Sequence, residues 1–475
     1  MGLRVLSWRR LGRPDGPGLR QIRCEPDSHD ARWCPSCGAY ARVRSSWLRT
    51  LAHVPYGDDA VHLLVRVRRY ECVPCSRSWS DDLEAVGAGR GVLSVPAVMW
   101  ALRRVCLDSM TVSACARLLH VAWAVVDRAV RERGMLLLEQ ADRFSSVRAI
   151  GVDEHVWRHG AFGDRYVTVI VDLTPRCDGR PARLLDMVPG RSAQVLREWM
   201  QARGGEFTRR VGVVAMDAFA GWKQAVESVV PHAVEVIDPF HVVQLAAARV
   251  TKVRCRLQRD ATGRRGVKGD RLYDCRRALL TSDEYLGARG RARLMALFAI
   301  QANRDLMLAH DAYQRVIHAY RCDDRRRGER MMRELIDDLT GPGRYKGCRE
   351  LASLGRVLKR RMRDILALFR HPRSSNGPTE AINGRLETLR GNAMGFANTT
   401  SYIQRCLIHS SQLKDILTHY PEKSPLCLLP ICLQPLPLHR RTNAPNTRLV
   451  NCSSLVSSSH FDWNGRISSC NIDVA

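Results

Sequence analysis

The sequence lacks any long uncharged apolar run, and none approaches the roughly 18 residues that a membrane-spanning helix needs. Its first residues, "MGLRVLSWRRLGRPDGPG", also lack the apolar core of a secretory signal. Acidic residues are scarce beside basic ones: Asp and Glu total 48 against 75 Lys and Arg, and the net charge is +27. We therefore expect a cytoplasmic protein with a polyanionic partner, foremost nucleic acid. A generally basic protein from an arginine-rich proteome is the alternative on charge alone.

The length and the cysteine usage indicate a modular, reduced protein. A chain of 475 residues is too long for one ordinary core, so about two to four folded units are expected. Most of the 17 cysteines are scattered singly, which is typical of reduced thiols. Residues 421–475 are rich in Pro, Ser, Leu and Cys without periodicity, and this composition predicts a disordered tail.

Two C-x-x-C pairs are the sharpest local signal. "CPSCG" supplies Cys34 and Cys37, and "YECVPC" supplies Cys72 and Cys75, with strand-like sequence between the pairs. Four thiolates suit a tetrahedral Zn²⁺ ion and leave no open coordination position for chemistry. The pattern predicts a structural zinc ribbon in residues 1–90. Unconnected pairs or disulfides are the alternative.

Residues 91–143 carry a helical pattern. The apolar positions of "MTVSACARLLHVAWAVVDRAVRERG" fit two helices joined at "LHVA", which predicts a helix-turn-helix. His120 stands where such turns commonly have glycine, and Ala122 where they have a capping Ser or Thr. The second helix, 123–133, is expected to enter the DNA major groove. Its candidate DNA contacts are Arg128, Arg131 and Arg133. An ordinary solvated helix face explains these arginines too.

From residue 144 the pattern changes to strands. "VRAIGVDEHVW", "DRYVTVIVDLTP" and "ARLLDMVPG" predict three strands in succession, and "RVGVVAM" predicts a fourth after an intervening helix. This order indicates a mixed sheet covered by helices in residues 144–245. Asp153 is expected at the end of the first strand and Asp217 just after the fourth. The two carboxylates converge if these strands are neighbours.

A third acid follows a run of turn residues in "RSSNGPTEAINGRLETLRG". Glu380 falls in the first turn of the expected helix, with Asn383 on the same face. Three carboxylates suit Mg²⁺ or Mn²⁺, which can activate a nucleophile and stabilise the leaving oxygen of a phosphodiester. On the other faces of this helix stand two candidate phosphate contacts, Arg385 and Arg390.

Other titratable residues compete for these roles. Glu154 should point to the opposite face of the strand from Asp153. Asp172 lies at the end of an apolar run before "TP", which favours a turn role. Asp238 precedes Pro239 and is interpreted as a helix cap, with an auxiliary acid as the alternative. His241 is either a phosphate contact or a structural histidine.

The spacing of the acids predicts an insertion. Far more residues separate Asp217 from Glu380 than a sheet needs to return a helix to its face. Residues 246–372 have helical periodicity throughout, so we expect a helical insertion there. The last part of the core then occupies residues 373–420.

The motifs "GVDEHVWRHG", "VVAMDAFAGWKQAV", "DPFHVVQL" and "SNGPTEAINGRLETLRGNAMGF", with the two cysteine pairs, resemble those of DDE transposases of the ISL-three insertion-sequence family. The resemblance covers Cys34 to Leu417. It implies a ribonuclease-H-like core in which Asp153, Asp217 and Glu380 form the catalytic triad. It also implies that the ribbon and the helix-turn-helix bind the terminal inverted repeats, that DNA strands are transferred, and that the protein is an oligomer on DNA in the bacterial nucleoid.

The expected fold class is therefore α+β and multidomain. It comprises a zinc ribbon, a helix-turn-helix domain, a mixed α/β core with a large helical insertion, and a disordered tail.

Two other functions compete with transposition. A catalytically inactive DNA-binding relic would use only the ribbon and the helix-turn-helix. A nuclease acting on RNA hybrids would share the metal chemistry but leaves the helix-turn-helix and the insertion unexplained.

Overall fold

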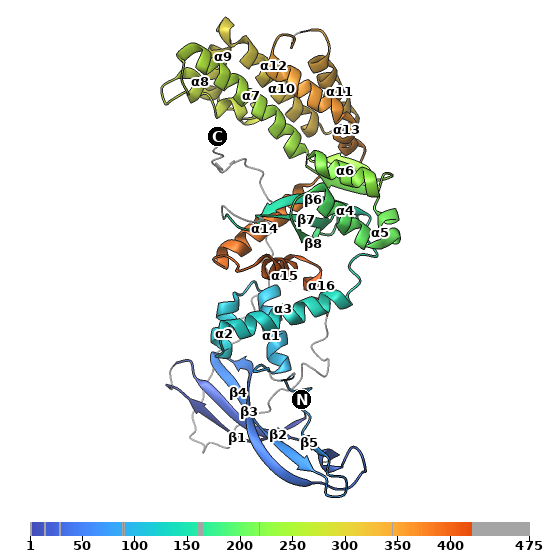
Figure 1. Cartoon of the computed structure of the whole chain (residues 1–475). Helices are drawn as coiled ribbons and strands as arrows, with labels where there is room; N and C mark the ends of the chain where they lie inside the picture. Colours follow the sequence, from blue (N-terminus) through green and yellow to red (C-terminus); the bar gives the residue numbers. More distant parts are fainter. Residues whose placement is uncertain are drawn as a thin grey trace, which may run out of the picture. The chain divides into compact units, whose positions relative to one another are not determined.

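The chain is described by a computed structural model that contains two β-sheets and many helices (Figure 1). The described residues are 2–419 except 14–15, 28–29, 88, 90, 160–164, 218, 344 and 372. The tail predicted at 421–475 lies outside them. Within the described residues, no helix combines the length and the apolar character needed to cross a bilayer.

The N-terminal sheet has five strands, with the order β1-β2-β4-β3 and β5 paired to β4. The strand-like sequence between the cysteine pairs forms strands, and β4 alternates: Leu63, Val65 and Val67 are buried, whereas Arg66 is exposed. The buried side chains pack with Leu51 of β3 into a small core. The strands are β1 Leu3–Leu11, β2 Leu19–Pro26, β3 Arg42–Tyr56, β4 Asp59–Glu71 and β5 Ser78–Ser80.

Three helices follow: α1 Val95–Cys106, α2 Val112–Leu119 and α3 Trp123–Gln140. The side chains of Ser94 and Thr111 cap α1 and α2 by accepting from backbone N–H groups. His120 ends α2 in the left-handed conformation, with φ 54° and ψ 48°. Glycine is common at this position of such turns because it adopts the left-handed conformation without strain. The two helices and their shared apolar core are confirmed, but α3 extends beyond its predicted end at residue 133.

The second sheet also has five strands, in the order β10-β9-β6-β7-β8. Strands β6, β7 and β8 form an antiparallel meander, while β9 runs parallel to β6 and β10 runs parallel to β9. The predicted mixed sheet is therefore confirmed, and its first and fourth strands are adjacent, which was the condition for the two acids to converge. The strands are β6 Ala149–Val156, β7 Tyr166–Asp172, β8 Arg183–Pro189, β9 Val213–Met216 and β10 Val234–Ile237.

Helices cover both faces of this sheet. On one face, Trp199, Phe207 and Trp222 of α4, α5 and α6 pack with side chains of β6 and β9. On the other, Ile382 of α14 and Tyr402 of α15 pack with β7. The helices are α4 Ala193–Ala202, α5 Gly204–Arg210, α6 Ala220–Val229, α14 Gly377–Asn392, α15 Thr399–Ser410 and α16 Leu413–His419.

The segment between β10 and α14 is helical, as predicted for residues 246–372. Its first helix, α7, starts at Pro239 and runs on without a break into this segment. Its helices enclose a core of their own, which is separate from the cores around the sheets. They are α7 Pro239–Thr262, α8 Arg271–Asp274, α9 Ala288–Phe298, α10 Arg304–Arg321, α11 Arg325–Thr340, α12 Arg349–Arg360 and α13 Met362–Arg370.

Candidate functional site

Asp153 and Asp217 lie next to each other on adjacent strands. Parallel strands β6 and β9 pair Val152 with Met216, and each acid is the residue that follows its member of this pair. The sequence predicted that Asp153 ends its strand, and this prediction is wrong. Strand β6 continues to Val156 along β7. The pairing of β6 with β9 ends at Val152. Beyond this residue the edge of β6 that faced β9 is open, and Asp153 lies on that open edge.

The environment of these two acids raises their pKa values. Asp153 is only 8% exposed. Burial raises its pKa to about 7, with additional repulsion from the charges of Asp217 and Glu380. Burial also raises the pKa of Asp217. A bound divalent cation would offset the cost of burying the charged carboxylates and the repulsion between them.

Helix α14 brings Glu380 to this edge of the sheet. Asn383, one turn after Glu380, donates from Nδ2 to Asp153 Oδ2 at 2.9 Å. Asn376, the residue before the helix, donates from Nδ2 to the carbonyl oxygen of Val152 at 3.1 Å. The close approach requires a glycine in β6, because a Cβ at Gly151 would lie 2.6 Å from Asn376 Oδ1. The face predicted for Glu380 and Asn383 is therefore the face that meets the sheet.

Two further residues join Glu380 at this position. Carboxylate or imidazole atoms of Asp238, His241 and Glu380 all lie within 4.8 Å of one another. His241 Nε2 is 3.8 Å from Glu380 Oε1. Burial, followed by the charge of Asp238, raises the pKa of Glu380 to about 7. Asp153 and Asp217 lie outside this close group, so Glu380 stands between an acid pair on the strands and an Asp–His pair at the start of α7.

Asp238 caps two helices at once. Its Oδ2 accepts from the backbone N–H of Phe240 at 3.0 Å, which confirms the predicted cap of α7. Its Oδ1 accepts from the backbone N–H of Asn376 at 2.8 Å, at the start of α14. The roles of Asp238 and His241 remained open in the sequence, and their contact with Glu380 was not predicted. The available signal was the i, i+3 spacing in "DPFH", which places both residues at one helix start.

The donor set fits a hard divalent cation. Carboxylate oxygens with one imidazole nitrogen are ligands that Mg²⁺ and Mn²⁺ accept. Two buried atoms, His241 Nε2 and Asn383 Oδ1, have no hydrogen-bond partner among the described residues. Unpartnered buried polar atoms are costly, so these atoms favour a bound ligand.

The other acids of this region have structural partners. Glu154 is exposed and lies 3.1 Å from Arg191, so it points away from Asp153 as predicted. Asp172 is fully buried, pairs with Arg183 at 2.9 Å, and accepts from the backbone N–H of Thr174. The predicted turn role of Asp172 is confirmed.

The five candidate DNA-binding arginines differ in whether their side chains already have partners within the protein. Arg128 and Arg385 are exposed, and no side-chain hydrogen bond or ion pair is found for them within the described residues. The other three have partners inside the protein. Arg131 pairs with Asp127 at 2.8 Å and donates to Gln404 at 2.9 Å. Arg133 donates to Met99 Sδ, and Arg390 pairs with Glu387 and contacts His159.

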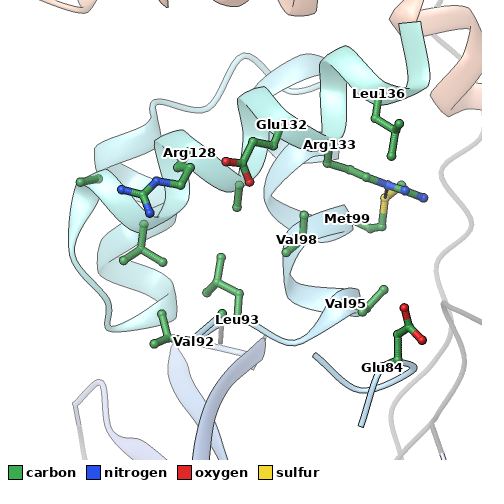
Figure 2. Close-up of a pocket in the computed structure, with 14 residues that line it drawn as sticks. Glu84, Val92, Leu93, Val95, Val98, Met99, Arg128, Glu132, Arg133 and Leu136 are labelled. Carbon is green, nitrogen blue, oxygen red and sulfur yellow. Dashed lines mark hydrogen bonds between the residues drawn. The ribbon is translucent and has the colours of Figure 1, made fainter. Parts of the chain in front are cut away.

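An open groove lies beside α3, away from the acids. It has a volume of about 970 Å³ and is bounded by α1, α3 and residues 91–93. Figure 2 shows apolar side chains such as Leu93 and Val98 in it, with Arg128 and Glu132 of α3 along one side. The open side of α3 thus carries charges of both signs.

The four predicted zinc ligands come together at the open end of the β3–β4 hairpin, opposite its turn. Sulfurs of Cys34 and Cys75, and of Cys37 and Cys72, lie 3.5 Å and 3.4 Å apart. These distances approach the edge of a tetrahedron with zinc–sulfur bonds of about 2.3 Å. They far exceed the about 2.05 Å of a disulfide. The cluster therefore has the geometry of a structural zinc site, as predicted.

Comparisons with known proteins agree with this geometry. Residues 150–406 match the ISL3-type DDE transposase family, which is described as "Transposase". Residues 30–75 match the "zinc-finger of transposase IS204/IS1001/IS1096/IS1165". The first match covers more than half of the chain. The chain therefore belongs to the ISL3 family of insertion-sequence DDE transposases.

Two curated relatives are from Mycobacterium tuberculosis, strains CDC 1551 and H37Rv. Each is named "Transposase for insertion sequence element IS1557". Each is 28% identical to this chain over 258 residues, which are 52% of this chain and 53% of the relative. The match thus spans about half the length of these relatives.

Proposed function

We propose that the protein is an active transposase that binds the terminal inverted repeats of its own element, cuts the DNA at the element boundary and joins the cut strand to a target. The carrying observation is that Asp153 and Asp217 follow paired residues of adjacent strands, while α14, the helix that carries Glu380, is hydrogen-bonded to Asp153 through Asn383. The paired residues are Val152 and Met216.

The fold supports this proposal. A meander of three strands, extended at its first strand by two parallel strands, is the arrangement expected of a ribonuclease-H-like core. We assign the core to residues 144–245 and 373–420, interrupted by the helical insertion at 246–372. Residues 1–90 would form the zinc ribbon and 91–143 the helix-turn-helix that together hold the element end.

The chemistry follows from the acids. When bound, Mg²⁺ or Mn²⁺ would activate the attacking hydroxyl and stabilise the leaving oxygen. Asp153, Asp217 and Glu380 would hold the ions, with Asp238 and His241 fixing the position of Glu380. Asn383 would orient the Asp153 carboxylate. Arg128, Arg131, Arg133, Arg385 and Arg390 are the proposed DNA contacts, and transposition would require an oligomer that pairs two DNA ends.

The test is cleavage of a labelled duplex that carries the flanking element's own end. The protein is assayed with Mg²⁺ or with EDTA, beside Glu380→Gln and Asp217→Asn. We expect metal-dependent nicking at the element boundary that both variants lose while still binding the duplex. If the wild-type protein binds this end but cuts it with neither Mg²⁺ nor Mn²⁺, it is a DNA-binding relic. If it cuts RNA–DNA hybrids and ignores the element end, it is a ribonuclease.

A further inference from the structure

One face of the N-terminal sheet carries a cluster of arginines. Residues that pair across neighbouring strands, or stand two apart along one strand, have side chains on the same face. Ile22 and Val65 mark the face that packs with Leu83 and Val86 into the small core. The arginines that the register places on the opposite face are Arg4 and Arg9 of β1, Arg23 of β2, and Arg66 and Arg68 of β4. We call this surface the arginine face.

A buried carboxylate fixes two of these arginines. Glu25 lies on the same face of β2 and is only 4% exposed. Its Oε1 accepts from Arg4 and its Oε2 accepts from Arg68. Burial raises the pKa of Glu25, but the neighbouring arginines outweigh burial, so this pKa lies below its usual value. The ionised Glu25 thus holds Arg4 and Arg68 in place with both of its oxygens occupied.

Two other arginines of this face have no partner within the described residues. Arg23 and Arg66 are exposed, and no hydrogen bond or ion pair of their side chains is found there. Arg23 pairs with Leu64 across the parallel strands, so Arg66 is the next residue on this face of β4. Arg9 donates to the neutral amide of Gln21 at 2.9 and 2.7 Å, so its charge is not neutralised either. Cations this close together repel one another unless an external anion binds to them.

The acids near the arginine face do not cancel its charge. Asp59 and Glu71 lie on the opposite face of β4 and are paired with arginines there. Asp81 accepts hydrogen bonds at 2.7 Å from a hydroxyl and from a backbone N–H of β4. Asp27 is exposed beyond the end of β2. Even with Glu25, Asp27 and Asp81 all counted, five arginines against three acids leave a net charge of +2 on this face.

The arginine face continues the surface of the helix-turn-helix. Helix α2 packs on β3 and β4 at one end of this face (Figure 1), where the ring centroids of His62 and His120 are 5.9 Å apart. His120 ends α2 at the turn that leads into α3. Arg66 follows His62 by four residues along β4, or about 13 Å. One DNA strand advances about 3.4 Å per nucleotide, so a duplex held at the turn would reach Arg66 after about four more base pairs.

We propose that Arg23 and Arg66 bind phosphates of the DNA duplex that the helix-turn-helix holds, about four base pairs away from its turn. Guanidinium groups bind phosphate oxygens well, and such contacts fix the position of a duplex without reading its sequence. This inference rests on the proposed function. It assigns the DNA to one face of the N-terminal sheet and leaves the cysteine cluster a purely structural part.

The experiment measures how salt weakens the binding of DNA to the full-length protein, with Ca²⁺ in place of Mg²⁺ so that no strand is cut. Two duplexes of equal length are compared, one with the element end and one with an unrelated sequence. The variants are Arg23→Gln and Arg66→Gln. The matched control is Arg69→Gln, since Arg69 is exposed on the same strand as Arg66 but on its opposite face.

We expect Arg23→Gln and Arg66→Gln each to weaken binding to both duplexes by a similar factor of roughly three to ten, because phosphate contacts do not depend on sequence. Each should reduce the slope of log affinity against log salt concentration by about one. Ethylation of the contacted phosphate should weaken binding of the wild type and not of the variant that lost the contact. Arg69→Gln should keep the wild-type slope. Melting temperatures should stay at the wild-type value, because these side chains have no hydrogen bond to lose within the described residues.

Two results would overturn the inference. One is Arg23→Gln or Arg66→Gln matching Arg69→Gln in affinity and slope. The other is a loss confined to the element-end duplex, which would mean that the arginines read bases. A wild-type protein that binds both duplexes equally and cuts neither with Mg²⁺ would instead refute the proposed function, and that result needs no variant.

Discussion

Asn383 donates from its amide Nδ2 to Asp153 Oδ2 at 2.9 Å and thereby joins helix α14 to strand β6 across 230 residues of sequence. The bond leaves Asn383 Oδ1 buried without a partner in the described part of the chain. An amide is suited to this position because it donates to the carboxylate without adding a charge.

Replacing this amide with a carboxylate should impair catalysis. Asn383→Asp would place a second acid against Asp153, where like charges repel. We expect DNA cleavage to fall about a hundredfold, a loss of roughly 3 kcal/mol in transition-state stabilisation, with DNA binding largely retained. Asn392→Asp adds the same charge at the exposed end of α14 and should cut normally. Equal rates for the two variants would contradict the positioning role.

The close approach of α14 to β6 predicts a severe effect of one methyl group. In Gly151→Ala, the new Cβ would lie 2.3 Å from Thr379 Oγ1 and 2.6 Å from Asn376 Oδ1. We expect a loss of about 2 to 3 kcal/mol in the free energy of unfolding, measured by urea denaturation, because the start of the helix must move.

A matched substitution is available within α14 itself. A Cβ at Gly384 meets nothing within 4 Å, so Gly384→Ala should be neutral or stabilise the helix by up to about 1 kcal/mol. Similar stabilities of the two alanine variants would mean that α14 does not pack as tightly on β6 as the structure indicates.

The raised pKa of Asp153 predicts a pH-dependent stability. The folded protein holds this proton up to about pH 7, whereas the unfolded chain releases it near the ordinary value of 3.8. The folded state therefore binds more protons between these values, and the wild type loses stability as the pH rises through them. Asp153→Asn lacks this loss. In EDTA, its stability advantage over the wild type should grow by about 2 kcal/mol between roughly pH 5.5 and pH 8.

Metal should reverse this pattern. We expect Mg²⁺ to raise the melting temperature of the wild type more at pH 8 than at pH 5.5, and to raise that of Asp153→Asn less at either pH. Asp58→Asn, which removes an exposed acid from the β3–β4 turn, should follow the wild type. A pH-independent difference between Asp153→Asn and the wild type would refute a raised pKa.

The cysteine cluster predicts that zinc holds the end of the N-terminal sheet. Cys72→Ser should lower the zinc content of the purified protein from one ion to a small fraction, because a structural site needs all four thiolates. We expect easier proteolysis between β1 and β5, with the second sheet intact. Cys322→Ser changes a cysteine outside the cluster and should keep its zinc. Full zinc occupancy in Cys72→Ser would exclude the four-cysteine site.

Two arginines of α3 should separate DNA binding from stability. Arg128 is exposed, so Arg128→Ala should weaken binding to the element end, with a salt dependence reduced by about one ion, and should leave the melting temperature unchanged. Arg131 ties α3 to Asp127 and Gln404, so Arg131→Ala should lower the stability by about 1 kcal/mol. Unchanged DNA binding by Arg128→Ala would remove it from the interface.

Much of the site was predictable because its signals are local. The strand pattern around Asp153 and Asp217 and the turn before Glu380 are each contained in a short stretch of sequence. The C-x-x-C spacing of each cysteine pair by itself predicts that two sulfurs face one metal ion. These features need no knowledge of distant residues.

The features that the sequence did not predict, or left open, depend on tertiary packing. The meeting of Asp238 and His241 with Glu380 is set by where the insertion leaves and rejoins the core. The attachment of Arg131 to Gln404 spans 273 residues. The continuation of α3 past residue 133 is stabilised by packing on α15, where Gly134 leaves room for Ile408. The spacing of Asp238 and His241 places them at one helix start, but no local pattern encodes their contact with Glu380 or the other two contacts.

The double cap of Asp238 has an architectural consequence. The backbone enters the helical insertion at α7 and leaves it at the start of α14, and one carboxylate binds both points. The junction where the insertion joins the core is therefore also the support of the helix that carries Glu380, so a change at Asp238 would reach both helices at once.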